Sequence, residues 1–417
     1  MEILSTGQKI KRARIYKGLT LKDICDNKIS VSKMSCIEND KIKPDDEVLE
    51  LISGKLSLKS DYLKEGVKEQ ITNNLKVLEN SKKRHDYENL LEYNLKYAEE
   101  YSYFDLAFEV MHRLFNYYLD SGKLEKLQIN TSKYYDYWQK SDIEKNATDY
   151  YIDVARYFFT TSEFAQAANY YNNVRKSSRK NGNNMILAKA TYNESACYVM
   201  LEDYERAYEI SVRLIDLCDY MDSDLHKAEA YHMLALLSIR MDKGKFEEYE
   251  AKSYELYKDD AAHKALAIYN YAAVMFKVGS TEKALEYINR ALQTYPRNDE
   301  EKYVRFMILV IGELVENNIL DLSQSVCDDA LNYAIKLDNL KLVERAYYFK
   351  SIILEKQESY DMAEMYMNLS FDALRKFGNN QDIYKRYLKL GDLYYKLGDT
   401  YDSLKYFNLA IKLEKKL

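Results

Sequence analysis

The sequence predicts an all-α chain in which a small N-terminal domain precedes a long stack of helical hairpins. Only 12 glycines and two prolines occur among the 417 residues. Because these two residues interrupt regular structure most strongly, their scarcity favours nearly continuous helix. A pattern of small and large apolar residues also recurs at intervals of about 40 residues through most of the chain. The beginning of the chain differs, because there short helix-like runs alternate with turn residues.

The first predicted element is a helix in the run GQKIKRARIYKG, which ends at Gly18. A second helix is expected to open at Thr20, whose hydroxyl can cap a free backbone amide, with Asp23 three residues later as the partner of a capping box. Ser30 is in position to cap a third helix, VSKMSCIEN. A tight turn between two short helices is typical of the helix-turn-helix motif, whose second helix enters the major groove of DNA.

Within the third helix, Met34 and Ile37 share one face at a spacing of three and are expected to point into the core. The remaining side chains face outward, and none of them can make the bidentate base contact of an arginine or a glutamine. The residues predicted to read base edges are Val31, Ser32, Lys33, Ser35 and Cys36.

Charge is distributed unevenly along the chain. Residues 1–43 hold ten Lys or Arg against five Asp or Glu, although the whole chain carries a formal net charge of −6. This asymmetry favours a polyanionic partner for the N-terminal part alone. For Lys41 and Lys43 a plain solvated loop is the alternative interpretation. The residues predicted to contact DNA phosphates are Lys9, Lys11, Arg12, Asn39, Lys41 and Lys43.

These segments carry a resemblance to the Xre-type DNA-binding family, through GQKIKRARIYKGLT, ICDN, SVSKMSCIEN and Pro44, over residues 5 to about 63. The resemblance implies that Arg14 pairs with Glu38 inside the small domain, although Arg14 could instead touch DNA. Asp40 stands where many relatives have glycine, so the left-handed turn expected after the third helix is less favoured here. We assign residues 1–66 to this domain and residues 67–84 to a helical linker.

The remaining residues, 85–417, form a repeat region. A small residue that is followed four positions later by an aromatic or apolar one, and seven positions later by another, recurs at Ala167, Ala207, Ala284, Ser323, Ala363 and Ser403, with weaker copies at Leu127 and Glu247. Each copy predicts one helical hairpin. The last one, LKLGDLYYKLGDTYDSLKYFNLAIKL, resembles the tetratricopeptide repeat, which implies a right-handed superhelix of about eight to nine hairpins with a concave face.

Two asparagines occupy one repeat position on the helices expected to line that face. Asn193 and Asn270 stand fourteen residues before the anchors Ala207 and Ala284, and each follows a tyrosine. An amide side chain can both accept from and donate to a peptide bond, so the pair could grip the backbone of an extended ligand. Capping or bridging between helices is the alternative. The residues predicted to bind a peptide are Arg156, Tyr192, Asn193, His232, Tyr269, Asn270 and Arg305.

An Xre-type domain followed by tetratricopeptide repeats resembles the RRNPP family (Rgg, Rap, NprR, PlcR, PrgX), with size and repeat number nearest to its NprR/PlcR-like members. The resemblance implies a quorum-sensing transcriptional regulator that binds operator DNA as a homodimer and is switched by a short imported signalling peptide. A higher oligomer in the peptide-bound form is the alternative to a dimer. The alternative is a Rap-like repeat protein that binds a response regulator of a phosphorelay, or a scaffold.

Catalysis has little support in the sequence. Nucleotide-binding, zinc-protease and nucleophile-elbow motifs are missing, and the five histidines form no ligand set, so we expect neither enzymatic activity nor a cofactor or metal. The five cysteines make no CxxC pair and are expected to be reduced. With neither a signal peptide nor a membrane span in the pattern, a cytoplasmic location is expected.

Overall fold

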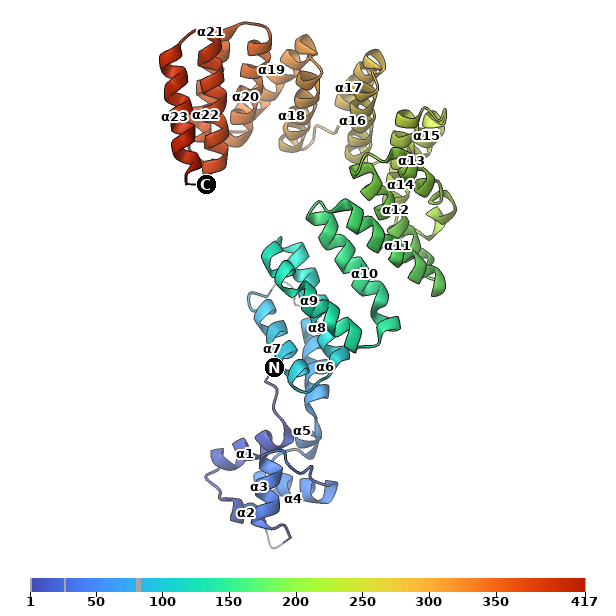
Figure 1. The fold of residues 1–417 in the computed structure, drawn as a ribbon, viewed down its shortest axis with the longest axis vertical. Helices are drawn as coiled ribbons and strands as arrows, with labels where there is room; N and C mark the ends of the chain where they lie inside the picture. Colours follow the sequence, from blue (N-terminus) through green and yellow to red (C-terminus); the bar gives the residue numbers. More distant parts are fainter. Residues whose placement is uncertain (1, 26–27, 80–83, 417) are drawn as a thin grey trace. The chain divides into compact units, whose positions relative to one another are not determined.

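The structure is a computed structural model that describes residues 2–25, 28–79 and 84–416 (Figure 1). Every regular element within these ranges is a helix. The chain divides into two compact units, unit 1 (residues 1–210) and unit 2 (residues 211–417), and the boundary falls inside one helix. The prediction of an all-α fold, with a short-helix domain followed by stacked hairpins of the tetratricopeptide type, is confirmed.

Unit 1 opens with five short helices and continues with longer ones. Its helices are α1 (Thr6–Tyr16), α2 (Leu21–Cys25), α3 (Val31–Glu38), α4 (Asp46–Leu56), α5 (Ser60–Lys64), α6 (Val67–Leu78), α7 (Tyr87–Glu100), α8 (Phe104–Asp120), α9 (Leu124–Lys140), α10 (Ile143–Thr160), α11 (Phe164–Lys180), α12 (Asn184–Met200) and the first part of α13 (Tyr204–Val212).

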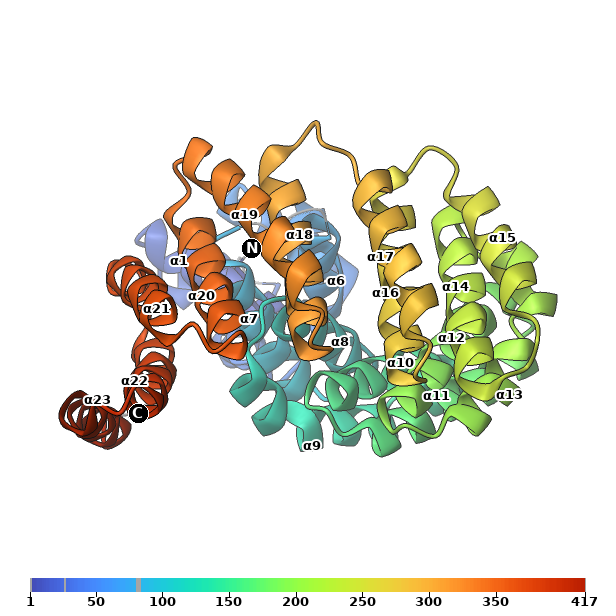
Figure 2. The ribbon, with the colours of Figure 1, turned by 90° about the horizontal axis from the view of Figure 1, so that it is seen from above.

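Unit 2 consists of paired helices that follow one another in chain order, from α14 and α15 to α22 and α23 (Figure 2). Its elements are a short 3₁₀ helix (Ile215–Tyr220), α14 (Asp224–Met241), α15 (Phe246–Tyr257), α16 (Ala261–Lys277), α17 (Thr281–Thr294), α18 (Glu300–Glu316), α19 (Leu320–Lys336), α20 (Leu340–Lys356), α21 (Tyr360–Leu374), α22 (Asn380–Lys396) and α23 (Thr400–Glu414).

The small domain folds around an apolar core that includes Ile10, Ile24, Met34 and Ile37. Ser30 caps α3 as predicted, because its hydroxyl oxygen accepts a hydrogen bond from the Lys33 amide at 3.1 Å. The cap of α2 differs from the prediction. There the Thr20 hydroxyl and amide both donate to the Asp23 carboxylate at 2.7 Å, so the carboxylate, rather than the hydroxyl, is the capping acceptor.

The stretch expected to be a linker contributes a helix that joins the repeat core. Along α6, Val67, Ile71 and Leu75 are buried in the same apolar cluster as α7 and α8, and Ile3 enters that cluster from the N-terminus. An amphipathic helix is stabilised mainly by packing its apolar face, so α6 behaves as part of the first hairpin.

Anchor positions of the repeats lie in the second helix of each hairpin. The anchors Ala167, Ala207, Ala284, Ser323 and Ala363 are fully buried, whereas the weaker anchor Glu247 is exposed. Small residues there let the two helices approach. The Ser351 hydroxyl donates to the Ala363 carbonyl at 2.6 Å, and the Ser403 hydroxyl donates to the Gly391 carbonyl at 2.9 Å. A methyl group on Gly391 would lie 2.8 Å from the Phe407 ring, so this position requires glycine.

Tight turns between the helices explain how so few glycines suffice. After α10, Ser162 adopts a left-handed φ of 63° and the Glu163 amide donates to the Phe158 carbonyl at 2.8 Å, which is a Schellman turn. The same bond pattern recurs after α12 and α20, where Glu202 and Glu358 take the left-handed position. Non-glycine residues pay roughly 1 kcal/mol for this conformation, which the packing of the two helices outweighs.

Candidate DNA-binding and peptide-binding surfaces

The outward face of α3 carries the residues predicted to read base edges. Val31 and Ser32 are exposed, and Lys33, Ser35 and Cys36 are half-buried, whereas Met34 and Ile37 point into the core. Lys33 forms an ion pair of 3.7 Å with Asp45, which still leaves much of its side chain exposed. The helix therefore presents a small, mostly polar surface of the size that fits a major groove.

Most of the predicted phosphate contacts surround this face as exposed side chains. Lys11, Lys41 and Lys43 are exposed and hold no ion pair within the part of the chain that the structure describes. Arg12 is exposed as well but pairs with Glu2. The Asn39 amide donates to the Ser35 carbonyl at 2.8 Å, so one of its two donors is already used.

The prediction for Lys9 is wrong. Its side chain is 1% exposed, and its ammonium donates to the Tyr62 and Glu65 carbonyls at 2.6 and 2.7 Å. Burial lowers the pKa of Lys9, and the nearby Glu65 carboxylate opposes that shift. An ammonium enclosed by backbone carbonyls cannot reach a phosphate, so Lys9 has a structural role.

The structure brings Arg14 and Glu38 together as the resemblance implied. Arg14 donates through Nε to Glu38 Oε1 at 2.6 Å and through Nη2 to Oε2 at 2.9 Å, and a third bond reaches the Leu19 carbonyl. The hydrogen bond to Glu38 raises the pKa of Arg14. Asp40 follows α3 with a left-handed φ of 55°, and its carboxylate accepts from the Gly7 amide at 3.0 Å, which offsets the missing glycine.

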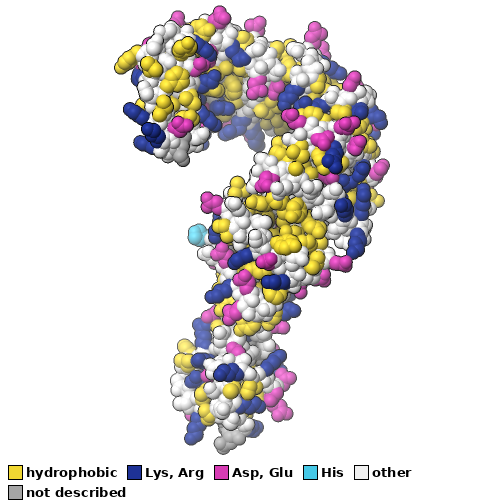
Figure 3. Space-filling model, in the orientation of Figure 1, with side chains coloured by type: hydrophobic (Ala, Val, Ile, Leu, Met, Phe, Trp, Pro, Cys, Tyr) yellow, Lys and Arg dark blue, Asp and Glu magenta, His cyan; other side chains and the backbone are white. Residues whose placement is uncertain are grey.

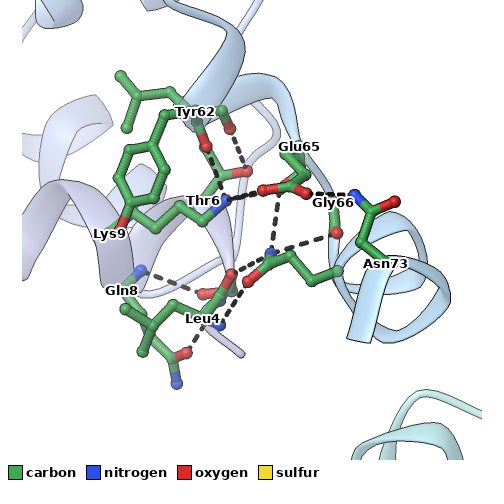
Figure 4. A network of polar contacts seen from close by, with 11 residues as sticks. Leu4, Thr6, Gln8, Lys9, Tyr62, Glu65, Gly66 and Asn73 are labelled. Carbon is green, nitrogen blue, oxygen red and sulfur yellow. Dashed lines mark hydrogen bonds and ion pairs between the residues drawn. The ribbon is translucent and has the colours of Figure 1, made fainter. Parts of the chain in front are cut away.

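A group of residues that we call the N-terminal clamp (Ile3, Leu4, Lys9, Glu65 and Gln70) fastens the small domain to the first repeat helices. Figure 4 shows its polar part around Leu4, Lys9 and Glu65. The Gln70 amide accepts from the Leu4 amide at 3.0 Å and donates to the Leu4 carbonyl at 2.8 Å. The Ile3 amide donates to the Tyr93 hydroxyl on α7. Sequence reasoning missed the clamp, because the contacts join residues more than 50 positions apart.

In unit 1, the predicted peptide-binding residues lie on the first helices of the hairpins. We call the surface formed by α8, α10 and α12 the first-helix face of unit 1, and the surface formed by α14, α16, α18, α20 and α22 the first-helix face of unit 2. Asn193 is half-buried, and its side chain makes no hydrogen bond within the described residues. Next to it, Glu194 forms a buried ion pair of 2.5 Å with Arg175. Tyr192 is half-buried.

Arg156 belongs to a polar network that the sequence did not reveal. It donates to the side chains of Asn116 and Asp120, the latter at 3.1 Å. The Asn116 amide and the Tyr134 hydroxyl both donate to the buried Asp153 carboxylate, at 2.9 and 2.7 Å. His112 Nδ1 lies 2.6 Å from the same carboxylate. We call these residues the His112–Asp153 network.

Electrostatics distinguish this histidine from an ordinary one. Burial by itself would lower the pKa of His112, but the hydrogen bond and negative charge of Asp153 outweigh it and raise the pKa. A cavity of about 480 Å³ adjoins the network and is lined by side chains from α8 and α10, among them His112, Arg113 and Asn116. The signal that could have found these residues is the repeat period, because Asn116 and Arg156 are separated by one repeat of 40 residues.

In unit 2, the structure joins two predicted peptide-binding residues. The Asn270 amide nitrogen lies 3.3 Å from His232 Nε2, and Asn270 is exposed. Burial lowers the pKa of His232 to about 4. Its Nδ1 atom is buried without a hydrogen-bond partner among the described residues.

Tyr269 and Arg305 differ from the prediction in their surroundings. Tyr269 is buried, its ring contacts Phe306 edge to face, and its hydroxyl lies 3.4 Å from Glu313, so it is not a surface residue that contacts a ligand. Arg305 is exposed and donates to Glu301 on its own helix at 2.6 Å. The tyrosine position shared with Tyr192 therefore packs between hairpins in unit 2.

Comparisons with known proteins give partial likenesses. No protein-family model matches the chain. A TPR repeat-containing protein of Methanocaldococcus jannaschii is 31% identical over 198 residues, which are 44% of this chain and 32% of that protein. The chain thus spans about a third of the length of that curated relative.

Among solved structures, the apo form of the quorum sensor NprR from B. thuringiensis is 15% identical, with a TM-score of 0.44, over 84% of this chain and 99% of that one. The apo form of RapI is 15% identical, with a TM-score of 0.49, over 83% and 98%. Bacillus thuringiensis PlcR, in complex with the peptide PapR7 and DNA, is 17% identical, with a TM-score of 0.34, over 61% and 94%. Likenesses at this level carry no functional argument.

Two further findings bear on the class of protein. No helix within the described ranges is long and apolar enough to span a membrane. Among the same residues, no group of three or more histidine, cysteine or acidic side chains is arranged to hold a metal ion.

Proposed function

We propose that the protein is a cytoplasmic, peptide-responsive transcriptional regulator of the RRNPP type. In this proposal α3 of a homodimer reads operator DNA, and a short extended peptide binds the first helices of the hairpins. The N-terminal clamp is the observation that carries the proposal. Ile3 is buried in the repeat core and Leu4 bonds to Gln70 on α6, while Lys9 on α1 bonds to the Tyr62 and Glu65 carbonyls just before α6. In this proposal these contacts would carry a change in the first repeats to the small domain and thus to α3.

The DNA-binding half of the proposal rests on exposed cations around α3. Replacing Lys41 by alanine is expected to weaken binding to all duplexes and to reduce the slope of log K against log salt by about one unit, since one phosphate contact is lost. Fluorescence anisotropy with a duplex selected from a randomised library measures both quantities. A loss confined to one sequence contradicts a phosphate contact.

The matched control is Lys55→Ala, which removes one lysine from α4 in the same domain. It is expected to leave the salt slope unchanged. Ser32→Ala is expected to act differently from Lys41→Ala, because it should alter preference at one or two base pairs by less than the ~1 to 3 kcal/mol of a bidentate contact.

The peptide-binding half is tested by mass spectrometry of peptides that co-purify with the protein, followed by titration with the synthetic peptide. Asn193→Ala and Asn270→Ala are each expected to weaken binding by about 1 kcal/mol, the typical contribution of a hydrogen bond. Wild-type affinity in the double variant places the ligand elsewhere. A peptide that binds without any effect on DNA affinity contradicts the proposal that peptide binding regulates DNA binding.

A second candidate function, docking of a protein such as a response regulator, is favoured by one observation. Hydrophobic side chains gather over α10 and its neighbours in unit 1 (Figure 3). Tyr135 of α9 and Ile143 of α10 are exposed, whereas Trp138 and Tyr150, which stack at 4.3 Å, are buried. Exposed apolar patches can mark protein interfaces. Tyr135→Ser should abolish capture of a response regulator while leaving DNA binding unchanged.

A further inference from the structure

A groove of about 680 Å³ lies on the first-helix face of unit 2, between α20 and α22. Leu374 at the end of α21 and Phe377 just after it line the groove together with Tyr348 and Leu388. None of the residues predicted to bind a peptide lines it. The groove is therefore a separate concavity, whose apolar wall consists of these four side chains.

The acidic side chains of the groove are already engaged. Glu344 is buried and accepts from Arg386 at 2.7 Å and from Ser370 at 2.9 Å. Asp382 accepts from the Asn379 amide in the capping box of α22, and Asp392 pairs with Lys396 at 2.9 Å. Cations therefore compensate the charges of Glu344 and Asp392, and the Asp382 carboxylate is held in the helix cap.

Four cationic side chains of the groove are not compensated in this way. Lys341, Arg345, Lys385 and Lys389 line it, and none forms an ion pair within the described part of the chain. Two of them lie near aromatic rings: the Lys341 ammonium is 5.7 Å from the centre of Phe377, and the Arg345 guanidinium is 5.4 Å from the centre of Phe349. Such contacts leave the charge available to an anion.

We propose that this groove binds a stretch of peptide that carries both carboxylates and large apolar side chains. Its carboxylates can meet the four cations while its apolar groups cover Leu374, Phe377 and Leu388, which line the same groove. A bare phosphate would meet the cations but leave the apolar wall exposed to water. The inference goes beyond the proposed function, because none of the residues predicted to bind the signalling peptide lines this groove.

The test uses the full-length protein and a fluorescent hexapeptide in which glutamate and leucine alternate, with its glutamine counterpart as the neutral probe. Anisotropy is expected to show the glutamate probe binding at least tenfold more tightly than the glutamine probe. The double change Lys385→Glu and Lys389→Glu should remove that preference, because two attractive charges become repulsive. Arg386 is left intact, since its loss would strand the buried Glu344 carboxylate.

The matched control is the double change Lys412→Glu and Lys415→Glu, an equal change of charge on exposed side chains at the end of α23, outside the groove. It should keep the preference within twofold. Equal binding of the two probes, an equal loss in the control, or displacement of the probe by millimolar inorganic phosphate overturns the inference. If circular dichroism shows that the double variant is unfolded, Lys385→Gln and Lys389→Gln replace it and should each reduce the preference severalfold.

Because the probe-binding experiments are carried out without DNA, they test the proposal for the groove independently of the proposed function. Probe binding that depends on Lys385 and Lys389, in a protein whose DNA affinity never responds to peptides, supports the groove and rejects the switch. A DNA response to a co-purified peptide, together with equal binding of both probes, rejects the groove alone.

Discussion

Two histidines on first helices, His112 in unit 1 and His232 in unit 2, have opposite electrostatic surroundings. The pKa of His112 is raised because the Asp153 carboxylate lies 2.6 Å from its Nδ1 atom. The pKa of His232 is lowered to about 4, because burial is not balanced by a charge and its neighbour is the neutral Asn270. In both cases the partner comes from the first helix of the following hairpin. The residue supplied by that helix therefore sets the charge of the histidine.

The largest expected effect is a loss of stability in acid that depends on His232. A histidine whose folded pKa is depressed stabilises the fold above its unfolded pKa, and that stability is lost as pH falls toward the folded value. Between pH 6.5 and pH 4 the loss attributable to His232 is up to about 3 kcal/mol. Urea denaturation of wild type and His232→Gln at both pH values measures it. An identical pH dependence of the unfolding free energy in the two proteins would show that His232 does not differ from His112 in the way described above.

The next effect comes from Asp153→Asn, which makes the surroundings of His112 resemble those of His232. Removing the charge leaves burial as the dominant influence, so the pKa of His112 should fall below its ordinary value. The lost charged hydrogen bonds should cost about 2 kcal/mol of unfolding free energy. Histidine-selective NMR titration and urea denaturation follow the two quantities.

Asp149→Asn is the control for that variant, because Asp149 is exposed and acts on His112 only through its charge. Its effect on the pKa of His112 should be clearly smaller. In wild type the sign of the pH dependence is opposite to that of His232. The raised pKa of His112 contributes stability below about pH 6.5 that is lost as pH rises through the folded value.

The smallest expected effect is the converse change, Asn270→Asp. A carboxylate beside His232 should raise the pKa of that histidine by about 1 to 2 units, since an opposite charge favours the protonated form. Because Asn270 is exposed, solvent screens part of the interaction and keeps the shift at the lower end. An NMR titration that still gives a pKa of about 4 for His232 would show that burial alone controls it.

Local signals predicted a large part of the fold from the sequence. Ser30 and Ala363 stand where the pattern placed them, as a helix cap and a buried anchor, because both roles depend on near neighbours and on helical spacing. The outward face of α3 followed from the same spacing. The pairing of Arg14 with Glu38 was implied by family resemblance rather than by any local pattern.

Contacts between distant residues could not be predicted in this way. Lys9 looked like one more exposed cation, because nothing near it in the sequence shows that two backbone carbonyls more than 50 residues away converge on its ammonium. Asp153 likewise meets His112 across 41 residues. Aligning the repeats by their period of about 40 residues would have suggested such pairs, but not which of them hold a charge.

The clamp also constrains the order in which a newly made chain can assemble. The small domain can close its own core once Leu63 has left the ribosome, since all residues of that core precede this point. Ile3 finds its partners only after α6 and Tyr93 have emerged, about 30 residues later. At roughly 5–20 residues per second, synthesis of those residues takes about 1.5 to 6 seconds, during which the small domain can be folded but unattached. During translation the small domain can therefore fold before the clamp contacts that fix its orientation are able to form.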